Sequence, residues 1–301
     1  MTERQADIYK RVTDAIVTQL ENGVKPWSRS WAVSLSSGRI TRPIRFNGEP
    51  YRGINTLILW SEAVTKGYSS PRWLTYKQAA ELGAHVRKGE KGTQVVYYGQ
   101  GVNTKTDAET GEETTKGFRF LKVYTVFNTE QIDGLPEKYQ PVPKPTQPAP
   151  MLERLEHVDR FISQTSANVA YGGDRAYYSP ALDHIQMPKP EAFTNPESFY
   201  ATLLHELTHW TGAASRLDRQ QQGRFGSASY AEEELVAELA SAFLCADLDI
   251  TQEPREDHAS YLAAWLKILK SDSKAIFTAA AASERAADYL HSLQPKEQAA
   301  A

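Results

Sequence analysis

A proline-rich run from residue 136 to residue 150 divides this chain of 301 residues. Its sequence is PEKYQPVPKPTQPAP, and because proline removes backbone donors and favours extended conformations, the run predicts a semi-rigid linker without a core. The stretches on either side are each long enough for a domain with its own core. We therefore expect one domain over 1–135, a second over 151–293, and a disordered tail over 294–301.

Charge differs between the two sides of the linker. Residues 1–130 contain 19 Lys and Arg against 13 Asp and Glu, a net charge of +6, and the remainder contains 15 against 24, a net charge of −9. A basic domain joined to an acidic one predicts that the first meets nucleic acid. Because the sequence has no apolar run of membrane-spanning length, no signal-peptide pattern and one cysteine, Cys245, we expect a cytoplasmic protein with no membrane partner and a buried thiol.

The second half contains HELTH at residues 205–209, an HExxH sequence inside a predicted helix. The helix is expected to begin at an N-cap on Thr194 or Asn195 and to end at Gly212. Four residues make about one helical turn, so the two imidazoles would share one face and hold one metal ion. Glu206 would lie beside the metal as the general base for a bound water. Such a pentapeptide also arises by chance, so its surroundings carry the argument.

A third protein ligand is required, because two imidazoles do not hold a catalytic zinc alone. Position 215, where an HExxHxxGxxH enzyme has its third histidine, is Ser215, so that subclass is rejected. The predicted helix over 230–244 is the better source. Its Glu234 and Glu238 resemble the ExxxD helix of gluzincin metallopeptidases, which implies Glu234 as the ligand and Glu238 as the carboxylate that orients an imidazole. A merely solvated Glu-rich face is the alternative, and the choice among these two and Glu233 stays open.

The chemistry predicted for this site is water activation. Zinc, with Mn²⁺ or Co²⁺ as alternatives to it, would lower the pKa of a bound water and polarise a carbonyl, with His205 and His209 among its ligands, and Glu206 would take the proton. Three side chains are candidates for stabilising the tetrahedral intermediate: Tyr230, His258 and Tyr261. Short strands are expected over 176–180 and 183–188, and in zincins such an edge strand aligns an extended peptide. Residues 260–290, with Trp265 and Ile268 in the core, complete a mostly helical domain.

The first domain is expected to be a small α+β unit. Its predicted helices run from Ile8 to the stop at Asn22-Gly23, over 54–65, and from an N-cap at Thr75 to Leu82. Its predicted strands cover 85–87, 94–98 and 118–127, with a polar loop over 100–116.

Cations interleaved with aromatic residues predict contact of this domain with single-stranded nucleic acid, because unpaired bases stack and phosphates pair with cations. One cluster is a predicted turn with Arg87, Lys88 and Lys91. The other consists of aromatic–cation neighbours, and it adds four predicted DNA-binding residues: Arg52, Arg72, Trp73 and Lys77. The alternative interpretation places most aromatics in the core, namely Trp60, Trp73, Tyr124 and Phe127.

Several segments resemble the ArdC family of antirestriction proteins, whose N-terminal domain also occurs in TraC-type primases of conjugative plasmids. In the first half these are YRGIN at 51–55, SPRWLT at 70–75, VRKGEKG at 86–92 and YTVFN at 124–128. HELTHWTG at 205–212 and the helix over 233–244 extend the resemblance to nearly the whole chain. The resemblance implies an α+β protein with a small single-stranded-DNA-binding domain and a mostly helical, zincin-like metallopeptidase domain with a short sheet. It also implies protection of incoming plasmid DNA from host restriction.

The sequence therefore leaves three alternative functions. The first is a metal-dependent hydrolase that cleaves a protein, with a host restriction or repair protein as the candidate substrate. The second is a purely DNA-binding protein that masks transferred DNA, with the metal domain as a scaffold or docking module. The third is a metalloenzyme that processes DNA and would nick single strands.

Overall fold

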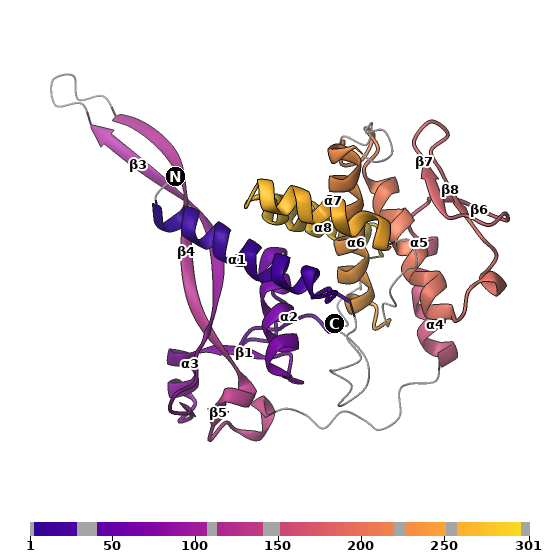
Figure 1. The fold of residues 1–301 in the computed structure, drawn as a ribbon. Helices are drawn as coiled ribbons and strands as arrows, with labels where there is room; N and C mark the ends of the chain where they lie inside the picture. Colours follow the sequence, from indigo (N-terminus) through magenta and orange to yellow (C-terminus); the bar gives the residue numbers. More distant parts are fainter. Residues whose placement is uncertain are drawn as a thin grey trace.

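The structure is a computed structural model that describes residues 3–28, 41–106, 113–140, 151–219, 227–250 and 258–295. Figure 1 shows a long hairpin with helices around its base on one side, and a helical body with a small sheet on the other. This arrangement confirms the expected α+β class. The first part contains α1 (Glu3–Glu21), α2 (Ile54–Lys66), β1 (Trp73–Thr75), α3 (Tyr76–Glu81), β2 (His85–Val86), β3 (Thr93–Thr106), β4 (Glu113–Asn128) and β5 (Ile132–Asp133), with 3₁₀ turns at Thr129–Gln131 and Glu137–Tyr139.

The helices of the first part follow the sequence signals closely. The apolar positions of α1 at four-residue spacing, Ile8, Ile16 and Leu20, are buried. Helix α3 begins with a capping box, in which the Thr75 side chain accepts from the Gln78 backbone N–H and the Gln78 side chain accepts from the Thr75 N–H. Helices α1, α2 and α3 confirm the three helices predicted for this part.

The hairpin corrects the expected loop over 100–116. Strands β3 and β4 pair antiparallel from Thr93–Val126 out to Thr106–Glu113, so most of that polar segment is strand. β-Branched and aromatic residues on both sides of the ladder favour the extended form, and the cross-strand pairs add to it. Strand β1 pairs with the end of β4, giving the order β1-β4-β3, and β2 pairs separately with β5.

Within the described residues, the second part contains a three-stranded sheet beside five helices. Its elements are α4 (Met151–Ser163), β6 (Asn168–Tyr171), β7 (Tyr177–Ser179), β8 (His184–Met187), a 3₁₀ turn (Pro190–Ala192), α5 (Pro196–Thr211), α6 (Ala228–Asp247), α7 (His258–Ser271) and α8 (Ala275–Ser292). The sheet order is β6-β8-β7, with β6 parallel and β7 antiparallel to β8, so β7 is an edge strand. The sequence did not predict α4 or β6, and the helical region expected over 260–290 consists of α7 and α8.

The first and second parts share one hydrophobic core. A single cluster of buried side chains includes Ile16, Trp27 and Leu57 from the first part and Phe243 and Trp265 from the second. Helix α1 packs against α7, and α2 packs against α8 (Figure 1). The β1, α3 and β5 region of the first part packs instead in two smaller clusters, one around Trp73 and Val126 and one around Leu74 and Ile132.

Arg42 is the main polar connection between the two parts. Its guanidinium is buried and donates to both carboxylate oxygens of Asp247 at 2.9 and 3.0 Å and to Glu284 at 2.9 Å. The same group lies 4.4 Å from the centre of the Phe243 ring. Burial raises the pKa of Asp247, but the hydrogen bond from His291 and the charge of Arg42 outweigh it and hold that pKa below its usual value. An ion-paired, hydrogen-bonded charge therefore fixes how the two parts pack.

Three other predictions from the sequence can be compared with the structure. Cys245 is buried, as expected. Within the described ranges no helix is long and apolar enough to cross a membrane. Residues 141–150 of the expected linker and residues 296–301 of the expected disordered tail lie outside the described residues, so the domain limits drawn from them stay predictions.

Candidate metal centre and nucleic-acid interface

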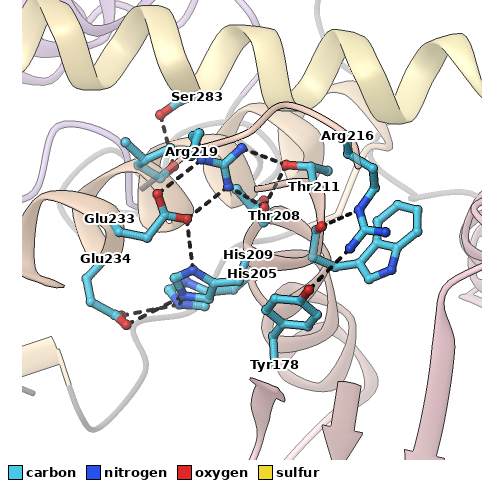
Figure 2. Close-up of polar contacts among 12 residues, drawn as sticks. Tyr178, His205, Thr208, His209, Thr211, Arg216, Arg219, Glu233, Glu234 and Ser283 are labelled. Atoms are coloured by element: carbon cyan, nitrogen blue, oxygen red, sulfur yellow. Dashed lines mark hydrogen bonds and ion pairs between the residues drawn. The ribbon is translucent and has the colours of Figure 1, made fainter. Parts of the chain in front are cut away.

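Helices α5 and α6 bring two imidazoles and a carboxylate together. Helix α5 is fixed at its start by Asn195, whose side chain accepts from the Ser198 N–H, and it therefore presents His205 and His209 one turn apart on the face toward α6. The two Nε2 atoms are 3.1 Å apart. Glu234 of α6 places Oε2 3.4 Å from the first Nε2 and Oε1 3.5 Å from the second (Figure 2).

This donor set fits a divalent metal. The ligand atoms of His205, His209 and Glu234 all lie within 4.8 Å of one another. Two nitrogens at zinc-ligand distance in tetrahedral geometry would be about 3.3 Å apart, close to the separation observed here. Two imidazoles plus one carboxylate leave room for a water in a four-coordinate site. The structure therefore brings together the three residues that the sequence predicts as a ligand set.

Glu233 contacts the Nδ1 side of the His209 ring, and Arg219 in turn binds Glu233. Glu233 Oε1 lies 3.1 Å from His209 Nδ1, and the Arg219 guanidinium donates to both oxygens of that carboxylate at 2.9 and 3.1 Å (Figure 2). Arg219 also donates to Thr211 at 2.8 Å, which anchors it to the end of α5. A carboxylate on the distal imidazole nitrogen fixes the ring orientation for metal binding.

The pKa values of the cluster residues reflect this packing. Burial lowers the pKa of His209, but the carboxylates of Glu233 and Glu234 outweigh it and raise that pKa to about 10. Burial raises the pKa of Glu233, and the hydrogen bonds from His209 and Arg219 more than offset it, bringing the pKa to about 2. The pKa of Glu234 is likewise held well below its ordinary value, by His205 and His209 against the effect of burial. Both glutamates are therefore carboxylates at neutral pH.

A cavity of about 210 Å³ opens onto this cluster. Glu206 lines it together with the ligands, and strand β7 forms its other wall through Tyr177 and Tyr178. Tyr230 and Tyr261, two of the three candidates for stabilising an oxyanion, also line it, with their hydroxyls 3.3 Å apart. The side chain of the third, His258, lies outside the described residues.

Arg216 ties the edge strand to the metal helix. Its guanidinium donates to the Trp210 carbonyl at 2.5 Å and to the Tyr178 hydroxyl at 3.2 Å, and it lies 4.0 Å from the centre of the Trp210 ring (Figure 2). It also donates to Asp183 at the β7–β8 turn. The position of β7 relative to α5 is therefore set by a side chain that comes after the helix in sequence.

Glu238 has a different setting from the one predicted. Its Oε1 accepts a hydrogen bond from the Trp27 indole at 3.2 Å and lies 3.6 Å from Lys25 Nζ. Both partners come from the first part of the chain. Its predicted bond to an imidazole stays a prediction, whereas for His209 the orienting carboxylate is Glu233.

The predicted DNA-binding residues are dispersed, and five of the seven have structural partners. Trp73 is 1 % exposed and packs against Tyr68, so it cannot stack on a base, and this prediction is wrong. Arg72 donates to the carbonyls of Arg45 and Phe46. Arg52 pairs with Asp288 and lies 3.4 Å from Glu284. The sequence did not distinguish the two settings, because a tryptophan ring can pack in a protein core as well as on a base.

The remaining predicted cations lie on α3 and on the turn between β2 and β3. Arg87 pairs with Glu90 at 2.8 Å and with Asp133 at 3.5 Å, so its charge is partly neutralised. Lys77 is exposed and lies 3.7 Å from Glu81. Lys88 and Lys91 are exposed on the turn between β2 and β3, where they can meet a phosphate chain.

Sequence reasoning missed Arg216 and Arg219 entirely, because an arginine after a helix carries no signal of the partner it will meet. It also assigned Tyr124 to the alternative core, yet this side chain is 46 % exposed on β4. The register of a hairpin decides such exposure, and the strand pattern alone left that register open.

An HExxH helix, a second helix with a third ligand, and an antiparallel edge strand beside them define a zincin-like domain, here joined to an α+β domain. Comparison with known sequences agrees with this class. Residues 156–282 match the family model of the zincin-like metallopeptidase, and residues 6–127 match that of the N-terminal domain of anti-restriction factor ArdC. The chain belongs to the ArdC family of antirestriction proteins.

Relatives cover nearly the whole chain. It is 43 % identical to the uncharacterized protein y4eC of Sinorhizobium fredii over 97 % of this chain and 94 % of that protein. It is 38 % identical to the DNA primase TraC of Escherichia coli over 99 % of this chain, which spans only 28 % of the primase.

Two crystal structures of the antirestriction protein ArdC from plasmid R388 have a similar fold. The metal-free structure has a TM-score of 0.78 at 43 % identity, and the match covers 95 % of this chain and 97 % of that one. The Mn(II)-bound structure has a TM-score of 0.77 at 41 % identity, with 96 % and 99 % covered.

Proposed function

We propose that this protein protects incoming DNA from restriction by combining a divalent-metal hydrolase site with a single-stranded-DNA-binding first part. The observation that carries the hydrolase proposal is the convergence of His205, His209 and Glu234 with Glu206 in one cavity beside the β7 edge. Family membership supports the antirestriction role. The net charge of +6 over residues 1–130 supports the contact with DNA.

In this proposal His205, His209 and Glu234 hold the metal, which when bound supplies a Lewis acid and lowers the pKa of a coordinated water. Glu206 accepts the proton of the attacking water and returns it to the leaving group. In the same proposal, the hydroxyls of Tyr230 and Tyr261, which both line the cavity, donate to a developing oxyanion. The metal is zinc on the chemistry of its donors, with manganese as the competitor because the relative from plasmid R388 binds Mn(II).

The proposed substrate is an extended peptide. An edge strand on the cavity wall offers backbone groups to pair with a peptide, in the manner of strand addition. Arg216 holds that strand at the metal helix, so the peptide would pass over the ligands. A host restriction or repair protein in the recipient cell is the proposed source of the peptide.

The test compares metal content with protection in living cells. Purified parent protein should contain about one zinc or manganese per chain by mass spectrometry, and His205→Ala and Glu234→Ala should lose it. Glu206→Gln should keep the metal and the fold but lose protection when an unmodified plasmid is transferred into a restricting host. Transfer into a restriction-deficient host is the control for all variants.

Each outcome separates the rival functions. Protection that survives in Glu206→Gln would leave the metal domain as a scaffold and make DNA masking the function. Parent protein that takes up neither metal after dialysis against zinc or manganese would contradict the hydrolase proposal. Metal-dependent nicking of a circular single strand by the parent, lost in Glu206→Gln, would instead favour a DNA-processing enzyme.

A further inference from the structure

One face of the β3–β4 hairpin carries aromatic side chains that belong to no core cluster of the described residues. Because β3 pairs with β4 antiparallel, the register Tyr97–Lys122, Gly99–Phe120 and Gly101–Phe118 places these residues on one face. Tyr124, opposite Val95, extends the row toward the hairpin base. We define the aromatic face by five residues: Tyr97, Phe118, Phe120, Lys122 and Tyr124.

At the hairpin base the aromatic face packs through Val95 and Val126, and beyond these residues it is the opposite face that packs on the protein. Val96 belongs to the shared core, and Leu121 and Val123 lie against it. The Tyr98 hydroxyl lies 3.1 Å from that of Tyr9 on α1. Figure 1 shows the hairpin running past α1 and beyond the rest of the molecule. The aromatic face is thus turned away from the helix that covers the other side.

The exposed rings form a continuous row. Tyr97, Phe118 and Tyr124 are 53 %, 50 % and 46 % exposed. A contiguous row of exposed aromatic rings is typical of an interaction surface. The ring centres follow one another at 6.4 Å from Tyr124 to Tyr97, 6.3 Å from there to Phe120, and 6.0 Å to Phe118. These spacings suit a strip of planar groups rather than a single deep pocket.

Two glycines let the phenyl rings lie over the neighbouring strand. A Cβ at Gly99 would be 2.2 Å from Cζ of Phe120, and one at Gly101 would be 2.6 Å from Cζ of Phe118. The rings therefore lean across β3 into the space that any other residue would fill, while Phe118 stays half exposed and Phe120 partly exposed. The glycines make the strip flat at the cost of strand propensity, which points to a use for it.

The charge around the strip selects an anionic partner. Residues 93–102 and 117–126 contain no Asp or Glu, and the register places the cation Lys122 on this face, whereas Arg119, opposite Gln100, belongs to the other face. The Lys122 ammonium lies 5.1 Å from the centre of the Phe120 ring, within the row itself. A partner that offers flat apolar groups at regular spacing on an anionic backbone is a single-stranded nucleic acid.

We propose that the aromatic face binds single-stranded DNA by stacking successive bases on its rings, with the phosphates near Lys122. This inference rests on the proposed DNA-binding function and assigns it a surface. Base stacking on an aromatic side chain tolerates any sequence, so the binding would have little sequence preference. The hairpin, rather than the buried Trp73, then supplies the aromatic half of the interface.

The test measures affinity of the full-length protein for a fluorescein-labelled oligo(dT) by anisotropy over a range of salt concentrations. Phe118→Ser and Tyr97→Ser should each weaken binding about 5- to 100-fold, as expected for loss of one stacked base. Neither should change the slope of log affinity against log salt, because no phosphate contact is lost. Lys122→Gln should make that slope shallower by about 0.7, the value for one phosphate on a single strand.

Two further variants separate the surface from the fold. Val102→Ser is the matched control, since Val102 is 67 % exposed on the opposite face of the same hairpin and should leave affinity unchanged. Gly99→Val keeps every aromatic side chain but displaces the Phe120 ring, and it should weaken binding as Phe118→Ser does.

The outcomes distinguish a failure of the aromatic face from a failure of the proposed DNA-binding function. Parent protein with no affinity for oligo(dT) at low salt would overturn both. Parent protein that binds, with Phe118→Ser and Tyr97→Ser binding equally well, would overturn the aromatic face and leave DNA binding to the cations. A parent dimer by sedimentation that these two variants convert to monomer, with DNA affinity unchanged, would show the face to be a contact between copies of the chain.

Discussion

The β3–β4 hairpin and the α5–α6 helix pair each bring side chains from two segments onto one surface, but by different means. The hairpin joins neighbouring segments, and its backbone ladder alone fixes which residues share a face. The helix pair depends on side chains from elsewhere: Arg219 holds Glu233, Arg216 holds the edge strand, and Trp27 reaches Glu238 from the first part of the chain. Exposure follows this difference, since the hairpin rings are half exposed and the metal cluster is nearly buried.

This difference teaches how each surface should respond to change. A site held by long-range packing loses geometry when a distant partner is removed, because buried polar groups are then left unsatisfied. A surface held by a local ladder loses only the side chain that is removed. Four predictions test the contrast, beginning with the largest expected effect.

Trp27→Ala should destabilise the whole molecule. The indole is completely buried, meets the Trp265 ring at 6.3 Å and donates to Glu238, so its removal should cost about 3–5 kcal/mol in the free energy of unfolding. Urea denaturation followed by circular dichroism measures this. Trp27→Phe keeps most of the apolar volume and should recover more than half of the loss. A loss below 1 kcal/mol in the alanine variant would mean that the first part does not support the metal helix.

Arg42→Met should cost about 3–5 kcal/mol at pH 7, because it leaves the carboxylates of Asp247 and Glu284 without their buried cation. The sign of the pH effect follows from Asp247, whose folded-state pKa is depressed. Its contribution is complete above the unfolded pKa of about 4 and is lost as pH falls through the folded value.

The penalty of Arg42→Met should therefore be the same at pH 7 and pH 5 and should shrink below about pH 4. Urea denaturation at these pH values measures it. Arg45→Met is the control, because Arg45 is an exposed cation 3.5 Å from Glu49, and its loss should cost less than about 1 kcal/mol at any pH. A penalty independent of pH down to pH 3 would show that packing on Phe243, rather than charge, is what Arg42 contributes.

Arg219→Met should weaken metal binding about 10- to 100-fold without removing a ligand. The arginine fixes Glu233, which in turn orients the His209 ring, and loss of such support typically lowers metal affinity by this factor. Competition with a chromogenic chelator measures the affinity. Arg216→Met, which disturbs the edge strand instead, should leave metal affinity within about twofold of the parent. Equal loss in both variants would attribute the effect to the α5 end as a whole.

Phe118→Ser should have the smallest effect on folding. The side chain is half exposed, so the free energy of unfolding should change by no more than about 0.5 kcal/mol. Thermal and urea denaturation beside Trp27→Ala give the comparison directly. A loss of 2 kcal/mol or more would show that the aromatic face supports the hairpin itself and would remove the contrast between the two regions.

Much of the molecule could be predicted from local sequence. Apolar spacing and caps determined α1, α2, α3 and α5, and the HExxH pattern put two imidazoles on one face of a helix. These features depend on residues a few positions apart, and their energies act before any tertiary contact forms. The same local logic placed Cys245 and Trp265 in the core.

Tertiary structure decided the rest. Five different features depended on pairing distant segments: the length of the hairpin, the burial of Trp73, the role of Glu233, the contacts of Glu238, and the arginines behind the metal site. A glutamate on a helix, an exposed tyrosine and an arginine in a loop each have several compatible environments, and local propensity does not rank them. The sequence by itself determined which helix could hold a metal; only the packing of α6, β4 and the first part of the chain determined which side chains support it and which rings remain open to a partner.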